Sequence, residues 1–184
     1  MTTTTAAPDP LHTPRNHGGM GAASRRNTFR HIYPLRTLGM GLGGLLLGSV
    51  LYGNQSPAWT WWLLALGALA WPHLAYLLAR HSRDPYRAEV RNLLIDSAIV
   101  GLWVPLMHFN LLPSVVLVAV TTYDKFSTGI KRLWLYSLPG MLGTGALATL
   151  LLRPEPRLES SLLVVIFTLP VIIVHTMAVS VASY

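Results

Sequence analysis

Three ionisable side chains, His73, Asp96 and His175, stand inside otherwise apolar stretches of the 184-residue sequence. An ionisable group inside a membrane is expensive unless it is paired or faces a cavity, so each one is a functional hypothesis. A histidine beside a buried carboxylate can bind and release a proton near neutral pH. The three residues therefore predict a site that senses protons or binds a ligand. The aromatic side chains expected to line it are Trp71, Tyr76 and Trp103.

Other interpretations of the same three residues stay open. Pro72 and Pro170 deprive the carbonyl groups of Ala68 and Ile166 of their helical donors, so the polar side chains could form a purely structural network. Two histidines and one carboxylate could also hold a transition metal, and two histidines on facing helices a haem. The histidines show no paired ligand spacing, so we expect neither a metal nor a cofactor in this chain.

The composition indicates the environment that must position these residues. Hydrophobic residues make up 52% of the chain and charged residues only 11%, against about a quarter charged in soluble domains. The charges are bunched between long apolar stretches, which is typical of an integral membrane protein. There is no cysteine, which excludes a disulfide framework, thiolate catalysis and Cys-ligated metals. Spans of about 20 residues each fill the chain, so no soluble catalytic domain fits.

Six apolar stretches predict six membrane-spanning helices. They cover residues 35–52, 58–79, 92–107, 111–123, 133–152 and 161–181. The third and fourth are short, and residues 108–110 join them without a charge, so we expect a helical hairpin that need not reach the far surface. The predicted fold is an all-α integral membrane protein, a six-transmembrane-helix bundle over residues 30–184. Residues 1–29 are expected to form a disordered basic tail.

The positions of Lys and Arg predict the orientation. The sequence has 14 Lys and Arg residues. Two of them are arginines within residues 153–159, and the other twelve lie in or beside the tail or in the connections 80–91 and 124–132. The positive-inside rule assigns these segments, and hence both termini, to the cytoplasm. Basic residues beside a membrane segment mark this face or contact anionic lipid, so no nucleic-acid partner is expected. Within residues 80–91, Glu89 is placed to meet Arg83 or Arg87.

Small residues recur at helix-packing intervals in the first span. They are Gly39 and Gly43, and Gly44 and Gly48. A face with small residues four apart lets two helix backbones approach closely. It can join two protomers or neighbouring helices of one chain, and both alternatives stay open.

The polar and small residues of the middle spans form a recognisable pattern. It consists of Trp71-Pro72-His73-Leu74-Ala75-Tyr76, Asp84-Pro85, Glu89, Asn92-Leu93, Asp96, Gly101, Trp103, Asn110 and Leu112-Pro113-Ser114. This pattern resembles the bacterial membrane-associated sensor domain of the second type (MASE, type two), over about residues 30–184. The resemblance implies an amino-terminal six-helix module of the bacterial inner membrane. In that family it is attached to cytoplasmic class III adenylyl cyclases or to diguanylate cyclases with a GGDEF domain.

The resemblance also implies a function. Both cyclases need two catalytic domains brought together, so we expect a sensor, regulatory and dimerisation module, acting as a homodimer. It would pass a membrane signal or a lipid-like ligand signal through the sixth helix to a nucleotide cyclase, with adenylyl cyclase slightly preferred. The parent enzyme would use Mg²⁺ with ATP or GTP, whereas this chain carries no catalytic residues. Because Ser183-Tyr184 still reads as helix, the chain is expected to be part of a longer protein.

Two other functions compete with a sensor. The first is a passive membrane anchor and dimerisation module that binds no ligand. The second is a small proton-coupled transporter, since buried Asp and His residues also form proton relays. Transporters often carry matched breaks in inverted repeats. Pro72 and Pro170 interrupt the second and sixth spans, which do not correspond in a three-plus-three repeat, so transport is the less favoured alternative.

Overall fold

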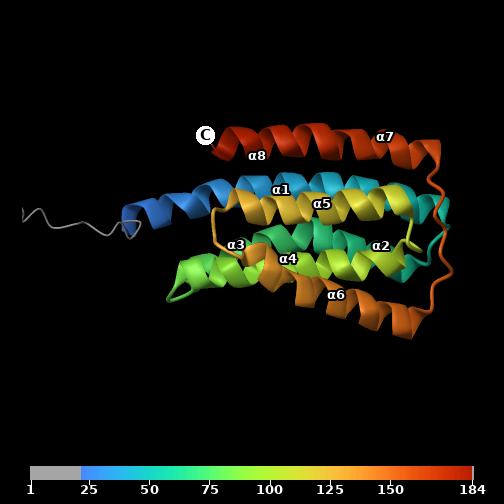
Figure 1. The fold of residues 1–184 in the computed structure, drawn as a ribbon, viewed down its shortest axis with the longest axis horizontal. Helices are drawn as coiled ribbons and strands as arrows, with labels where there is room; N and C mark the ends of the chain where they lie inside the picture. Colours follow the sequence, from blue (N-terminus) through green and yellow to red (C-terminus); the bar gives the residue numbers. More distant parts are fainter. Residues whose placement is uncertain (1–21, 184) are drawn as a thin grey trace, which may run out of the picture.

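The computed structural model describes residues 22–183, and within them every regular element is helical. In chain order these are α1 (Ala22–Gly53), α2 (Ala58–Ala65), the π-helical segment η1 (Leu66–Ala70), α3 (Trp71–His81), α4 (Pro85–Leu106), α5 (Leu111–Ser127), α6 (Leu133–Leu152), α7 (Leu162–Pro170), the π-helical segment η2 (Val171–His175) and α8 (Thr176–Ser183). The segments α2, η1 and α3 form one continuous helix, as do α7, η2 and α8. The described chain is therefore one bundle of six helices (Figure 1), which confirms the predicted all-α class.

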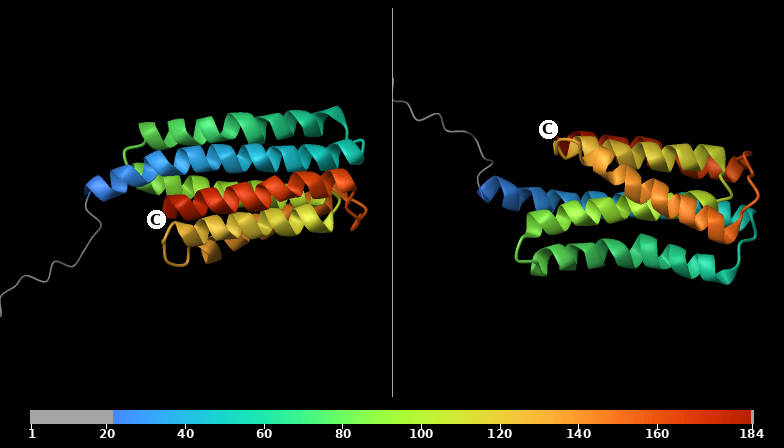
Figure 2. Two further views of the ribbon diagram at one scale, coloured as in Figure 1. Left: turned by 90° about the horizontal axis from the view of Figure 1, so that it is seen from above. Right: turned by 60° about the horizontal axis from the view of Figure 1, so that its bottom comes forward.

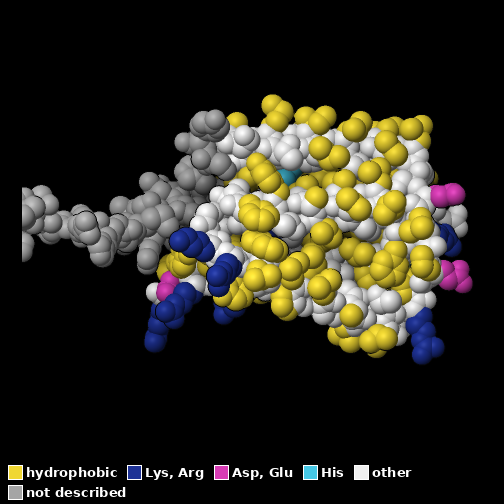
Figure 3. Space-filling view, in the orientation of Figure 1, with side chains coloured by type: hydrophobic (Ala, Val, Ile, Leu, Met, Phe, Trp, Pro, Cys, Tyr) yellow, Lys and Arg dark blue, Asp and Glu magenta, His cyan; other side chains and the backbone are white. Residues whose placement is uncertain are grey.

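Four of these helices are long and apolar enough to cross a membrane. They are Tyr33–Gly53, Ala58–His81, Leu133–Leu152 and Leu162–Val181. Large apolar side chains cover the outside of the bundle (Figure 3), and Leu150, Leu162 and Val181 are each more than 70% exposed. A surface this apolar is stable only against lipid. The helices α4 and α5 lie alongside the other four (Figures 1 and 2).

The two described ends of the chain lie at the same end of the bundle (Figures 1 and 2). The connections 82–84 and 128–132 are also there, and we call this the basic end because exposed Lys and Arg gather around it (Figure 3). The connections 54–57, 107–110 and 153–161 lie at the opposite end. There the backbone N–H of Arg157 donates to the carbonyl of His108 at 2.7 Å. The hairpin of α4 and α5 thus extends the length of the bundle, which the sequence left open.

Helix α1 begins earlier than the sequence predicted. Residues 22–29 are helical, although they fall in the segment 1–29 expected to be disordered. The Ala and Arg residues of this stretch are good helix formers, and extending an existing helix avoids the cost of nucleation. The rest of the predicted tail, residues 1–21, lies outside the described residues.

Local signals explain where two of the helices begin. Asp84 precedes α4 and its carboxylate accepts from the backbone N–H of Arg87 at 3.1 Å, with Pro85 at the first helical position. This is the preferred N-terminal arrangement of a helix. The Ser161 side chain accepts in the same way from Val164 at the start of α7.

Each predicted proline break is a wide helical turn. The segment η1 ends two residues before Pro72, and η2 begins directly after Pro170. Proline lacks the N–H that a helical carbonyl four residues earlier requires, and a π-turn re-pairs the freed groups without ending the helix. Both long helices therefore continue past their prolines.

The glycines of α1 pack against neighbouring helices of the same chain. A Cβ atom on Gly39 would lie 2.9 Å from the ring of His175, and one on Gly44 would lie 2.7 Å from Ala68 Cβ. A Cβ atom on Gly43 would contact Leu117, and one on Gly48 would contact Leu64 and Trp61. Of the two alternatives for this face, the structure uses the intrachain one.

Helices α4 and α6 cross at Gly101, which has the tightest surroundings of the described glycines. A Cβ atom on Gly101 would lie only 2.0 Å from the carbonyl oxygen of Met141. The Thr144 hydroxyl completes the contact by donating to the carbonyl of Ala98 at 2.7 Å. Only a glycine fits this crossing.

We expect Gly101→Ala to lower the free energy of unfolding by about 1–3 kcal/mol, because the added methyl forces α4 and α6 apart. Thermal unfolding in detergent micelles measures the effect. Gly143→Ala on α6 is the matched control, since its Cβ meets nothing within 4 Å. Equal melting temperatures for the two variants would contradict the packing described above.

Candidate functional site

A buried ion network ties α1 to α4 near the basic end. Arg36 of α1 lies between two carboxylates of α4, with Nε donating to Asp96 Oδ2 at 3.0 Å and Nη2 lying 2.5 Å from Glu89 Oε1. The side chains of Arg36 and Glu89 are only 4% and 6% exposed. Charges removed from water to this degree are stable only when they are paired and hydrogen-bonded. The network therefore sets the register of α1 against α4.

The same network extends to α3. Trp71 Nε1 donates to the second carboxylate oxygen of Asp96 at 2.7 Å. The fully buried Asn92 donates from Nδ2 to the carbonyl of Ala75 at 2.9 Å and to Glu89 Oε2 at 3.3 Å. Asp96 thus bonds with both of its oxygens, and three helices meet at it.

A second polar contact joins the last helix to α5. His175 Nε2 lies 2.8 Å from Asp124 Oδ1, so the imidazole N–H donates to the carboxylate. The His175 side chain is 3% exposed and that of Asp124 34%. The opposite ring nitrogen of His175 is buried, and the ring packs on Gly39. The π-turn η2 ends at His175, so this contact lies where the last helix returns to regular α geometry.

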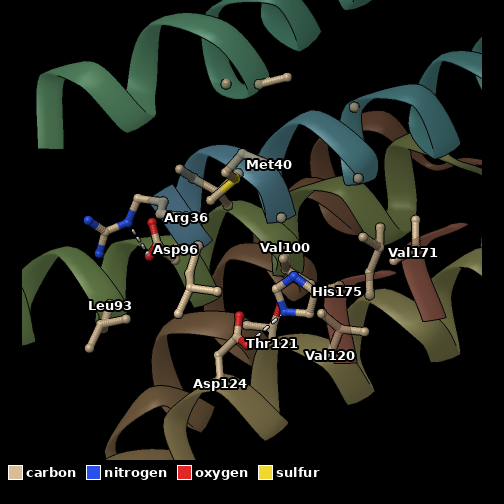
Figure 4. A pocket seen from close by; sticks show the side chains of 18 of the residues that line it. Arg36, Met40, Leu93, Asp96, Val100, Val120, Thr121, Asp124, Val171 and His175 are labelled. Carbon is tan, nitrogen blue, oxygen red and sulfur yellow. Dashed lines mark hydrogen bonds and ion pairs between the residues drawn. The ribbon is translucent and has the colours of Figure 1, made fainter. Parts of the chain in front are cut away.

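A cavity of about 130 Å³ lies between these two contacts (Figure 4). Its walls come from α1, η1, α4, α5 and the last helix. Apolar and small residues form most of the lining, including Gly43, Val100, Trp103, Leu117, Val120 and Val171. Its ionisable residues are Arg36, Asp96, Asp124, Lys125 and His175. The cavity therefore combines an apolar wall with a polar end.

The structure brings three of the six predicted site residues to this cavity. Asp96, His175 and Trp103 line it, and Trp71 reaches it through Asp96. Asp96 and His175 are not bonded to each other: each has its own ionic partner.

The expectation that His73 meets Asp96 and His175 is wrong. His73 is exposed, and its Nδ1 lies 2.8 Å from the hydroxyl of Tyr33. The predicted Tyr76 packs on Tyr33 with its ring tilted, at a ring-centroid distance of 4.6 Å, and lines a separate pocket. The reason is helical geometry: Pro72 is buried, and the next residue points about 100° further around the axis.

Sequence reasoning missed the ionic partners. Arg36 was counted there only as one of the basic residues beside the tail that set the orientation, and Glu89 was assigned to Arg83 or Arg87. Instead Glu89 pairs with Arg36, while Arg87 pairs with Asp84 at 3.3 Å on the surface. Arg36 lies inside the apolar stretch Tyr33–Gly53. A cation inside a membrane span needs a buried partner, and this was the signal that could have identified the network. The two adjacent charged residues Asp124 and Lys125, next to the fourth span, were a weaker signal.

No group of three or more His, Asp or Glu side chains suited to a metal ion occurs among residues 33–181. Around the cavity, Arg36 pairs with Asp96 and His175 with Asp124 instead.

Comparison with known proteins relates residues 31–119 to the family described as "MASE2 domain". Two curated relatives are the proteins named probable diguanylate cyclase DgcC from Escherichia coli strain K12 and from Escherichia coli O6:H1 strain CFT073. Each is 31% identical over 147 residues, which is 79% of this chain and 40% of the relative. The chain thus spans well under half the length of these relatives. No solved structure matches it. These relatives give no support to the preference for an adenylyl cyclase.

Removing the central cation should be far more damaging than removing a surface cation. We expect Arg36→Met to cost about 3–5 kcal/mol of stability, because it leaves two carboxylates buried without a partner. Arg87→Met removes an exposed pair, whose contribution is about 0–1 kcal/mol. Urea or thermal unfolding in micelles compares them.

A triple variant provides a further check on the same network. Adding Glu89→Gln and Asp96→Asn to Arg36→Met removes the orphaned charges and should restore part of the lost stability. An Arg36→Met protein as stable as the parent would show that the network contributes nothing.

Proposed function

Since this chain carries a MASE2 domain, homologous to the amino-terminal region of the probable diguanylate cyclase DgcC, we propose that it is the membrane sensor module of a diguanylate cyclase. The two curated relatives support this output over the adenylyl cyclase that the sequence slightly favoured, because both are named as diguanylate cyclases. The cyclase output also implies a homodimer. In this proposal the dimer forms through a surface other than the glycine face of α1.

The observation that carries the proposal is the cavity beside the last helix. One wall of that cavity is the helix that ends at the basic end, and His175 on this helix is held by Asp124 of α5. A stimulus can shift an equilibrium only by interacting differently with its two states. Occupation of this cavity would favour one position of the last helix over another. The position of that helix would then be the signal passed to the cyclase.

The proposal includes an orientation. Both described ends lie with the exposed cations at the basic end (Figures 1 and 3). The positive-inside rule places such an end in the cytoplasm, where a cyclase finds its nucleotide. The chain is then a multi-pass protein of the bacterial inner membrane with its amino and carboxyl ends inside.

Reporter fusions test this orientation. Alkaline phosphatase, which is active only in the periplasm, should be inactive when fused to either end of the chain and active when inserted between Glu155 and Pro156. A cytoplasmic fluorescent reporter should show the reverse pattern. Phosphatase activity at either end would rule out direct coupling to an intracellular enzyme.

The sensor function is tested in a chimera in which this chain replaces the matched region of E. coli DgcC. We expect His175→Leu to change basal diguanylate cyclase activity in membranes about fivefold or more, because it releases the last helix from Asp124. His81→Leu is the control, since His81 is exposed and bonds only within its own helix, to the carbonyl of Leu77.

The competing functions give different results in the same assay. A passive anchor predicts parental activity for His175→Leu with normal insertion and dimerisation. A proton-coupled transporter predicts proton flux into vesicles that contain this chain alone, and loss of that flux in Asp96→Asn. Either result would displace the sensor.

A further inference from the structure

We propose that the cavity binds one uncharged amphiphile, whose head group accepts hydrogen bonds through a carbonyl oxygen and whose hydrocarbon chain lies along the apolar wall. Esters, amides and quinones with an aliphatic chain belong to this class. The inference rests on the proposed function in one respect: it names the kind of ligand that such a sensor would take.

The apolar wall of the cavity suits a hydrocarbon chain. Gly43 and Gly44 of α1 lack side chains, and opposite them lie aliphatic residues of α4, α5 and η2 such as Val100, Leu117 and Val171. A bilayer supplies amphiphiles directly to an interior of this kind. Because water gains few hydrogen bonds at such a wall, filling it with hydrocarbon is favourable.

The polar end of the cavity presents a buried ammonium group. Lys125 is 2% exposed and is one of the largest fully buried side chains among the described residues. Lys125 forms no ion pair with any residue among 33–181, whose side chains the structure describes. An ammonium group carries three donors, and burying them without acceptors is costly. Lys125 therefore indicates a ligand that brings an acceptor.

The neighbouring carboxylates do not meet this need. Both oxygens of Asp96 are bonded, to Arg36 and Trp71. Asp124 uses Oδ1 for His175. A carboxylate oxygen can accept more than one hydrogen bond, but neither Asp96 nor Asp124 forms an ion pair with Lys125 among the described side chains. The cavity that Lys125 lines gives a ligand with an acceptor access to it.

The charge balance decides between an anionic and a neutral head group. The charged residues in the cavity lining balance one another, because the cations Arg36 and Lys125 are matched by the carboxylates Asp96 and Asp124. Glu89, which pairs with Arg36 outside the lining, adds a further negative charge. An anionic head would add a charge that no further cation neutralises, and an unmatched buried charge costs more than one hydrogen bond returns. A carbonyl accepts from the ammonium without that penalty.

Direct binding to the full chain in lipid nanodiscs tests the inference. The probe is a dodecanoic acid methyl ester that carries a photoreactive diazirine on its chain, and mass spectrometry locates the cross-links. We expect saturable labelling of the cavity segments of α5 and η2, competed by methyl decanoate but not by decanoate or decane. These competitors share one chain length and differ only in the head group.

Each alternative result overturns a defined part of the inference. Better competition by decanoate would show that the head is anionic. Equal competition by decane would show an apolar void with no head-group recognition. Labelling confined to lipid-facing residues such as Leu150 and Leu162 would show that there is no internal site.

Two matched pairs of variants check the assigned residues. Lys125→Met should weaken competition by methyl decanoate about tenfold or more, whereas Lys131→Met, an exposed lysine beyond the end of the same helix, should not. Val120→Phe should block the cavity, whereas Ala119→Phe places the same ring on the exposed face of α5. Thermal unfolding shows which variants are folded. If Lys125→Met does not fold, the comparison of Val120→Phe with Ala119→Phe decides whether the cavity is the binding site. Parental affinity in a folded Val120→Phe protein would refute the site.

This binding assay needs no cyclase, so the two proposals can fail separately. A chain that binds the ester while the His175→Leu chimera keeps parental activity has a ligand site but is not a sensor. A chimera that responds to His175→Leu while the chain binds no ester is a sensor of another stimulus.

Discussion

Burial of charge is the constraint on which this bundle depends. A guanidinium that is 4% exposed inside an apolar helix is tolerable only if its partners are already in place, so Arg36 fixes where Glu89 and Asp96 of α4 must lie. Asp96 in turn accepts from Trp71, which positions α3. The relative placement of three helices thus follows from one cation. Lipid-facing surfaces, which are uniformly apolar, could not supply that specificity.

The close approach of α1 to its neighbours makes the rest of the arrangement possible. Because Gly39 has no side chain, the ring of His175 packs directly on the α1 backbone. Gly44 admits η1 in the same way through Ala68. A larger residue at either position would push a neighbouring helix outward and open the cavity to lipid. The glycine face therefore serves the interior of one chain, where small residues substitute for the missing hydrophobic driving force between helices.

Much of this architecture could be predicted from the sequence because the bilayer limits the possibilities. Hydrocarbon thickness sets helix length, so the six apolar stretches located all six helices, and Asp96, Trp103 and His175 proved to share a cavity. Partners across helices were not predictable, since Arg36 and Asp96 are 60 residues apart and nothing local links them. The orientation of His73 depended on which face of its helix Pro72 occupies. Sequence spacing alone does not specify that face once a π-turn shifts the register.

The two ends of the bundle are built differently, and this difference determines where movement can occur. At the opposite end, Asn110 Nδ2 donates to the carbonyl of Glu159 at 2.9 Å and Ser160 donates to Asn110 Oδ1 at 2.5 Å. These bonds fix the start of the last helix to the turn between α4 and α5. At the basic end the same helix is held by the contact between His175 and Asp124, beside a cavity. The last helix is thus joined to a turn at its start, and near the basic end its contact with α5 borders a cavity. Any rotation about the fixed start would displace the helix most at the basic end.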